Sequence, residues 1–221
     1  MEFAEFQNFG WNTLTFSFLA TILFGVLGAL GLVDQIKKIW RNRSGESASV
    51  TFAIIFVAFF IASFIYGIDK HSLALILQGS IFRTVFFPPI LYGLWRFKGY
   101  TLFEKIVAFL CSSAIVYMLT LDDLKIKGYI FLGLGLLGVL ATLKQAWEIW
   151  KTKSSGVVSI KLMLIIHASS DFWLIYGIAL RDHMIKYMSL GYFIANTLVI
   201  VFWFKYRTKS PVATIPNNIS L

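Results

Sequence analysis

Long apolar stretches recur along almost the whole chain and constrain its fold more than any other feature. An apolar helix crosses the hydrocarbon core of a bilayer in about 20 residues. The candidate stretches are 14–33, 50–68, 73–95, 102–121, 129–143, 160–180 and 185–204. Hydrophobic residues make up 58% of the chain and charged residues only 14%, which argues against a soluble enzyme or a disordered, nucleic-acid-binding chain. The sequence therefore predicts an all-α integral membrane protein with seven transmembrane helices.

Lysine and arginine residues between the apolar stretches predict the orientation, because cytoplasmic loops carry an excess of them. Of the 20 such residues, 14 lie in the first, third and fifth loops and in the C-terminal tail. Five lie in the other loops, and Arg83 lies inside the third stretch. The N-terminus is therefore predicted to be outside and the C-terminus cytoplasmic. The first residues lack a basic segment, so they are not interpreted as a cleaved signal peptide.

The chain contains an internal repeat with a constant offset. Residues 28–68 align without a gap on residues 138–178, with 13 identities in 41 positions. Shared residues that apolar bias does not explain include Gln35/Gln145, Trp40/Trp150, Ser49/Ser159 and Tyr66-Gly67/Tyr176-Gly177. With the apolar stretch that follows, each copy forms a unit of three helices, and the fourth stretch is left over as a linker. One intervening span gives both units the same orientation, so they are parallel repeats.

This 3+1+3 arrangement sets the expected limits of the regions. They are an extracellular N-terminus (1–13), a first repeat (14–95), a linker helix with its loops (96–128), a second repeat (129–207) and a cytoplasmic tail (208–221). Parallel halves commonly rock around a site at the bilayer midplane, which gives alternating access. A duplicated scaffold without a transport path is the alternative.

The repeated motifs and the seven-span layout resemble the PQ-loop superfamily and, within it, the SWEET transporters. The motifs that carry the resemblance are the run Gln35–Ser44 and its copy Gln145–Ser154, the serines Ser49 and Ser159, and the two Tyr-Gly pairs. The resemblance covers about residues 12–207. Two features depart from the family: Asp34 and Lys144 replace the name-giving proline, and the first two helices of each repeat lack proline.

Polar side chains near the expected midpoints of three helices mark a candidate site, because charges at the bilayer centre are costly. Arg83 lies there in the third stretch, and Asn196 lies there in the seventh. His167 and Asp171 lie one turn apart on one face of the sixth. The equivalent positions in the other repeat are apolar, so folding alone does not require polar residues. Each residue also has a structural interpretation, such as an ion pair between Arg83 and Asp171 or packing between helices.

The expected solute-binding residues are Asn196, Trp173, Arg83, Phe86 and Tyr176. The resemblance implies a pocket asparagine in the last helix of each repeat; Asn196 matches it, and Phe86 occupies the equivalent position in the first repeat. Asp171 and His167 are expected to form an ion pair or to carry a proton, and the loops at Gln35 and Gln145 are expected to form a gate. No metal or other cofactor is expected, because His167 and Asp171 lack a third ligand.

The leading hypothesis is a transporter of a small polar solute, with a sugar implied by the resemblance. A proton-coupled carrier of an amino acid or organic acid is an alternative, since Arg83 can hold a carboxylate. A membrane receptor that reads a peptide or carboxylate is an alternative of another class. An enzyme is not expected, because no catalytic motif is present. The expected partners are the solute and membrane lipid but no nucleic acid, and a homo-oligomer is possible.

Overall fold

The computed structural model describes residues 2–43, 49–77, 82–153, 155 and 160–207, apart from some side chains that include those of Gln35 and Arg83. This part of the chain contains nine α-helices and no strand. The helices are α1 (Ala4–Gln7), α2 (Thr13–Asn42), α3 (Val50–Asp69), α4 (Leu73–Leu75), α5 (Phe82–Phe97), α6 (Leu102–Thr120), α7 (Leu124–Thr152), α8 (Ile160–Ala179) and α9 (His183–Tyr206). The all-helical prediction is therefore confirmed.

Five of these helices are long and apolar enough to cross a membrane: α2, α3, α6, α7 and α9. Helix α8 has a shorter apolar stretch, Met163–Ala179. The third predicted span corresponds to α4 and α5 together, and residues 78–81 between them lie outside the described residues. A membrane protein with several spans is supported, whereas the number seven stays a prediction.

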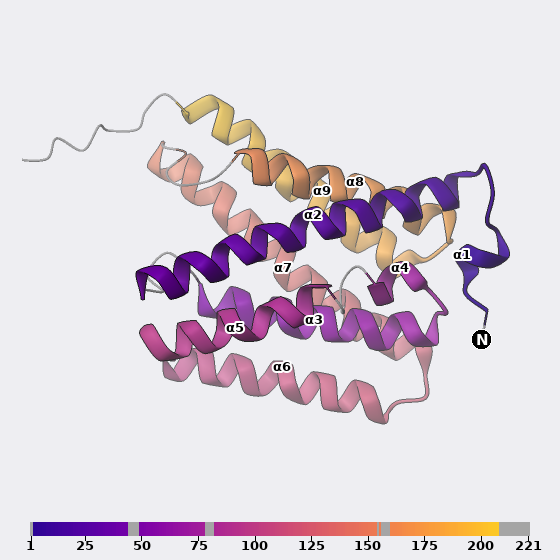
Figure 1. The fold of residues 1–221 in the computed structure, drawn as a ribbon, viewed down its shortest axis with the longest axis horizontal. Helices are drawn as coiled ribbons and strands as arrows, with labels where there is room; N and C mark the ends of the chain where they lie inside the picture. Colours follow the sequence, from indigo (N-terminus) through magenta and orange to yellow (C-terminus); the bar gives the residue numbers. More distant parts are fainter. Residues whose placement is uncertain (1, 44–48, 78–81, 154, 156–159, 208–221) are drawn as a thin grey trace, which may run out of the picture.

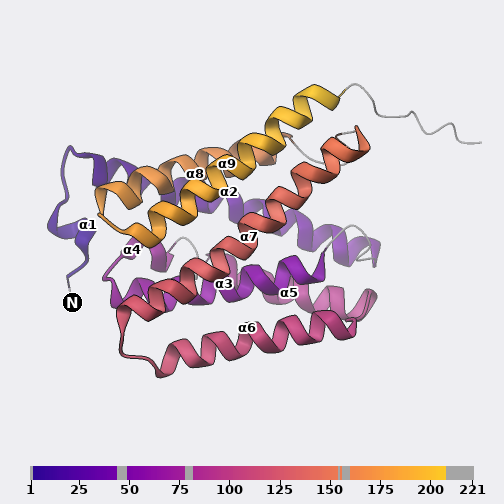
Figure 2. The same ribbon diagram turned by 180° about the vertical axis from the view of Figure 1, so that it is seen from behind.

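The long helices pack side by side in one bundle (Figures 1 and 2). We call α2, α3 and α5 the first group and α7, α8 and α9 the second group, after the two copies of the sequence repeat. Helix α5 packs against both α2 and α3, and α9 packs against both α7 and α8. Contacts of α2 with α8 and of α3 with α7 join the two groups. Helix α6, the linker of the predicted repeat, packs on the outside against α3. Helix α1 lies at one end of this bundle, which we call the N-terminal end (Figure 1).

The backbone repeats the offset found in the sequence. The described non-glycine residues with positive φ form two pairs at equivalent positions of the repeat: Arg43 with Lys153, and His71 with Arg181. After the second pair of turns, an oxygen of a side chain caps the next helix. Ser72 accepts from the backbone N–H of Leu75, and Asp182 accepts from those of Met184 and Ile185. The two groups therefore share local geometry as well as sequence.

The glycine of each Tyr-Gly pair lies where the following helix passes very close. A Cβ atom on Gly67 would lie 2.7 Å from Cβ of Leu75, and one on Gly177 would lie 2.9 Å from the backbone N of Lys186. Because real Cβ atoms do not approach other atoms so closely, glycine is required at both positions. This close approach explains why the glycine appears in both copies of the motif.

Candidate functional site

A cavity of about 470 Å³ lies between the two helix groups. Residues of α2, α3, α4, α7, α8 and α9 line it. At one end the wall includes the exposed residues Ser49, Lys144 and Glu148, so the cavity opens at the end of the bundle opposite α1. Its inner end reaches the buried residues Ser63 and Ser189. The volume is within the usual range for a small-molecule site.

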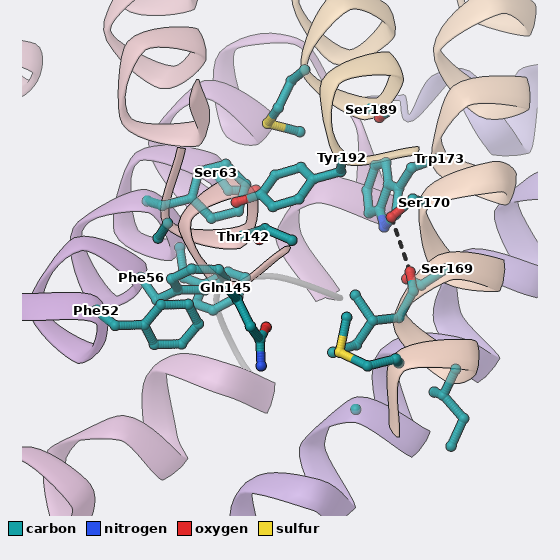
Figure 3. A pocket seen from close by; sticks show the side chains of 18 of the residues that line it. Phe52, Phe56, Ser63, Thr142, Gln145, Ser169, Ser170, Trp173, Ser189 and Tyr192 are labelled. Carbon is teal, nitrogen blue, oxygen red and sulfur yellow. Dashed lines mark hydrogen bonds between the residues drawn. The ribbon is translucent and has the colours of Figure 1, made fainter. Parts of the chain in front are cut away.

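The wall of the cavity combines aromatic rings with hydroxyl groups (Figure 3). The rings on the α3 and α7 side are those of Phe52, Phe56, Phe59, Phe60 and Phe131. The polar residues of α8 and α9 are Ser169, Ser170, Trp173, Ser189 and Tyr192. Figure 3 shows the Tyr192 ring projecting across the cavity toward α3, with Trp173 and the two α8 serines on the other side. At the open end, Lys144 Nζ lies 4.0 Å from Glu148 Oε1.

Three hydroxyl groups of the wall donate their proton to backbone carbonyls. Ser170 Oγ donates to Ile166 O at 2.9 Å, and Thr142 Oγ1 donates to Gly138 O at 3.1 Å. Ser63 Oγ donates to Leu75 O at 3.3 Å. A hydroxyl has one proton and two lone pairs, so each of these oxygens retains capacity to accept. The cavity therefore offers hydrogen-bond acceptors from three different helices.

Asn196 of α9 lies behind this wall and supports it. Its side chain is 1% exposed, and its Nδ2 donates to Ser170 Oγ at 3.1 Å. Since Ser170 also donates to Ile166, Asn196 fixes both the position and the hydrogen-bond direction of the Ser170 hydroxyl. Ser170 lines the cavity, whereas Asn196 does not.

Beyond the inner end of the cavity, a hydrogen-bond network ties the two helix groups together. We call it the N-terminal network; it consists of Glu5, Tyr66, Lys70, Ser72, Tyr176 and Asp182. Tyr66 of α3 donates its hydroxyl to Asp182 Oδ2 at 2.8 Å, and Lys70 Nζ lies 3.2 Å from the same oxygen. Tyr176 of α8 donates to Glu5 Oε1, and the hydroxyls of Tyr176 and Ser72 lie 2.7 Å apart. The bundle is therefore joined across its midline at the end opposite the opening.

The comparisons with known proteins agree with this architecture. A family model described as "Sugar efflux transporter for intercellular exchange" matches residues 126–217. A search of curated proteins finds no match. Among solved structures, the chain is similar to one titled "The 3.7 A resolution structure of a eukaryotic SWEET transporter", with a TM-score of 0.73. The sequence identity is 15%, and the alignment covers 88% of this chain and 96% of the other.

The chain is similar to SWEET transporters in the sequence of its second half and in its fold. The family model matches residues 126–217, and the likeness to the solved structure is one of fold, over nearly the whole chain. The resemblance that the repeated motifs predict is thus confirmed.

Two of the predicted site residues line the cavity, Trp173 of α8 and Gln145 of α7. Tyr176 instead belongs to the N-terminal network, because its buried hydroxyl bonds Glu5 and Ser72. Phe86 is not part of the cavity wall. The side chains of Gln35 and Arg83 lie outside the described residues, so their predicted roles stay predictions.

The predicted pair on α8 lies together but away from the cavity. His167 Nδ1 is 3.9 Å from Asp171 Oδ1, and the His167 ring stacks on Phe193 of α9. Neither residue lines the cavity. Within the described residues, no group of three His, Cys, Asp or Glu side chains could hold a metal ion.

Sequence reasoning missed most of the residues that line the cavity or close the bundle. Serine and threonine are frequent in helices, so Ser63, Thr142 and Ser170 carried no signal of their own. A signal did exist for the N-terminal network, because Ser72 and Asp182 are equivalent positions of the repeat. Each of them closely follows a Tyr-Gly pair, but Ser72 is uncharged and Asp182 is acidic.

Proposed function

We propose that this SWEET-like protein transports a neutral, hydroxyl-rich solute of the sugar class across the membrane. The observation that carries the proposal is the set of acceptor oxygens of Ser63, Thr142 and Ser170 on three sides of one cavity. A sugar brings many hydroxyl donors to such a site, and its apolar ring faces can rest on aromatic side chains such as Trp173.

The same acceptors disfavour the alternative of an anionic solute. A carboxylate only accepts hydrogen bonds, so it binds best where several donors or a cation converge. At the described inner end of the cavity, the wall residues are uncharged. Lys144, the cation among the lining residues, lies at the open end beside Glu148. This supports a sugar over an amino acid, an organic acid or the carboxylate of a peptide.

The proposed mechanism is alternating access between two three-helix repeats joined by α6. A cavity open at one end and tied shut by the N-terminal network at the other is what one state of such a cycle requires. With the N-terminus outside, as the positive charges predict, this state faces the cytoplasm. Transport then requires the N-terminal network to break while the end near Gln35 and Gln145 closes.

Uptake into liposomes that contain the purified protein tests the proposal. Labelled glucose and sucrose are compared with labelled pyruvate and alanine, with and without a pH gradient. We expect saturable sugar uptake that does not require the gradient. Trp173→Ala should reduce it at least tenfold, because the ring that faces the solute is lost, whereas the exposed Trp11 offers a matched control, Trp11→Ala.

The other outcomes separate the alternatives. Uptake of pyruvate or alanine with no uptake of sugar would support the acid carrier. A folded protein that moves none of the four solutes but retains an immobilised peptide would support the receptor.

A further inference from the structure

Asp182 has two functions at the N-terminal end of the second repeat. Its Oδ1 caps α9 by accepting from the backbone N–H of Met184 at 2.9 Å. Its Oδ2 accepts the hydroxyl of Tyr66, which belongs to the first repeat. One carboxylate therefore both begins a helix and joins the two halves.

The first repeat lacks a carboxylate at the equivalent position. Extending the ungapped alignment of the two repeats places Ser72 opposite Asp182. The short hydroxyl of Ser72 caps α4 at Leu75 and lies 2.7 Å from the Tyr176 hydroxyl. Tyr176 is the equivalent of Tyr66, so the contact between the halves exists twice. Within the repeats, only the second copy has a carboxylate at this position.

Glu5 of α1 supplies the missing carboxylate from outside the repeat. Its Oε1 accepts from the backbone N–H of Ala74 at 3.0 Å and from the hydroxyl of Tyr176. In the same alignment, Ala74 is the equivalent of Met184, and Tyr176 is the equivalent of Tyr66. Glu5 therefore accepts from the same backbone position and the same tyrosine position as Asp182 does, in the other half of the molecule.

The setting of Glu5 shows that this contact is built into the fold. Glu5 is 0% exposed, although α1 is a single turn of helix and its next two residues, Phe6 and Gln7, are exposed. Ser72 Oγ lies 3.3 Å from Oε1, and the backbone N–H of Ala4 donates to His71 O. A buried carboxylate needs hydrogen-bond donors to offset its desolvation. Ala74, Tyr176 and Ser72 bond Oε1, whereas Oε2 has no partner among the described residues.

We propose that Glu5 is a gate residue: it holds the N-terminal end closed by acting in place of the carboxylate that Ser72 lacks. The proposal rests on the proposed transport function, because a gate matters only if this end opens. It implies that the N-terminal end opens only when Glu5 leaves Tyr176 and Ala74, so the segment before α2 moves during each cycle.

Access of a thiol reagent to the cavity tests this role without any solute. Cys111, the single cysteine of the chain, is replaced by Ala, and Ser63→Cys places a thiol at the inner end of the cavity. A membrane-impermeant methanethiosulfonate is added to sealed vesicles on the side where an N-terminal tag is accessible. From that side, the reagent reaches the thiol only when the N-terminal end opens.

We expect Glu5→Ala to speed this modification about tenfold, the effect of losing charge-assisted hydrogen bonds. Adding Ser72→Asp should return the rate to within about threefold of the background, because a carboxylate at position 72 can bond Tyr176 and Ala74 as Asp182 bonds Tyr66 and Met184. Glu2→Ala, which removes the same charge from an exposed position of the same segment, should change nothing. If Glu5→Ala lowers the yield of folded protein, Glu5→Gln is measured with the same expectation.

An unchanged rate in the Glu5 variants, or no reversal by Ser72→Asp, would overturn the proposal. Failure of sugar uptake would not affect this measurement, since the reagent reports opening in the absence of solute. Conversely, normal sugar uptake with an unchanged modification rate would support transport but reject Glu5 as a gate residue.

Discussion

The hydroxyl of Tyr66 and the carboxylate of Asp182 lie 2.8 Å apart, although 116 positions of the chain separate them. Tyr66 lies near the end of the second helix of one repeat, and Asp182 begins the third helix of the other. Tyr176 bonds Ser72 and Glu5 in the equivalent way. The two residues of the Tyr-Gly motif therefore have different roles. The tyrosine joins the halves, and the glycine lets the next helix pass close by.

Tyr66→Phe should destabilise the closed N-terminal end. The substitution leaves the ring in place, where it stacks on Phe131, and removes only the bond to Asp182. We expect the apparent free energy of unfolding in detergent to fall by about 1–3 kcal/mol, because a bond to a charged group is lost. Tyr129→Phe is the matched control, since Tyr129 is exposed on α7. Equal melting temperatures for the two variants would contradict this role of Tyr66.

Gly67→Ala should also destabilise the protein, for a steric reason. The new Cβ would lie 2.7 Å from Cβ of Leu75, so α4 must shift at a cost of about 1–3 kcal/mol. Gly133 of α7 has no atom within 4 Å of an added Cβ, and Gly133→Ala should be neutral or stabilising because alanine favours the helix. Thermal unfolding of both variants, followed by circular dichroism, measures the difference. A stable Gly67→Ala variant would show that the glycine is not needed for close approach.

The fold was predictable because its signals are long and repeated. Apolar stretches of membrane length indicate helices, and the ungapped internal repeat predicts two equivalent halves. The third predicted span corresponds to α4 and α5, and residues 78–81 between them lie outside the described residues. Pro88 and Pro89 lie inside α5, although proline removes backbone donors.

The site was less predictable, because depth along a helix does not give its rotation. Trp173 and Asp171 lie at nearly the same depth of α8, yet Trp173 lines the cavity and Asp171 does not. Charged residues, histidine and asparagine are rare in the apolar stretches, so they were noticed in the sequence. The serines of the cavity wall were not noticed. Glu5 could not be found from the sequence, since its partners Ser72 and Tyr176 are 67 and 171 positions away.

Asn196→Ala should weaken solute binding through Ser170. Without the Asn196 amide, Ser170 Oγ no longer accepts a hydrogen bond from Nδ2. The free lone pair of Ser170 Oγ is then no longer held toward the cavity. We expect KM for the sugar to rise about tenfold with little change in kcat, the effect of about 1.4 kcal/mol of lost binding.

The comparison with Ser170→Ala decides how Asn196 acts. If Asn196 works through Ser170, the double variant should be no worse than either single variant. Additive effects on KM would mean that Asn196 contacts the solute itself, as the family resemblance implies. Restoration of KM by Asn196→Gln would support a positioning role that needs only an amide.

His167 and Asp171 provide the test of proton coupling. They lie 3.9 Å apart on α8, outside the cavity wall, with side chains that are 23% and 40% exposed. Within the described residues, neither Nδ1 of His167 nor Oδ1 of Asp171 has a hydrogen-bond partner.

If the protein is a passive sugar carrier, Asp171→Asn and His167→Gln should each leave uptake within about twofold, because neither side chain reaches the solute. Uptake is measured at equal pH on both sides and with the inside alkaline. A gradient that drives accumulation in the unmodified protein but not in Asp171→Asn would instead assign a proton to this pair, and the acid-carrier alternative would then replace passive transport.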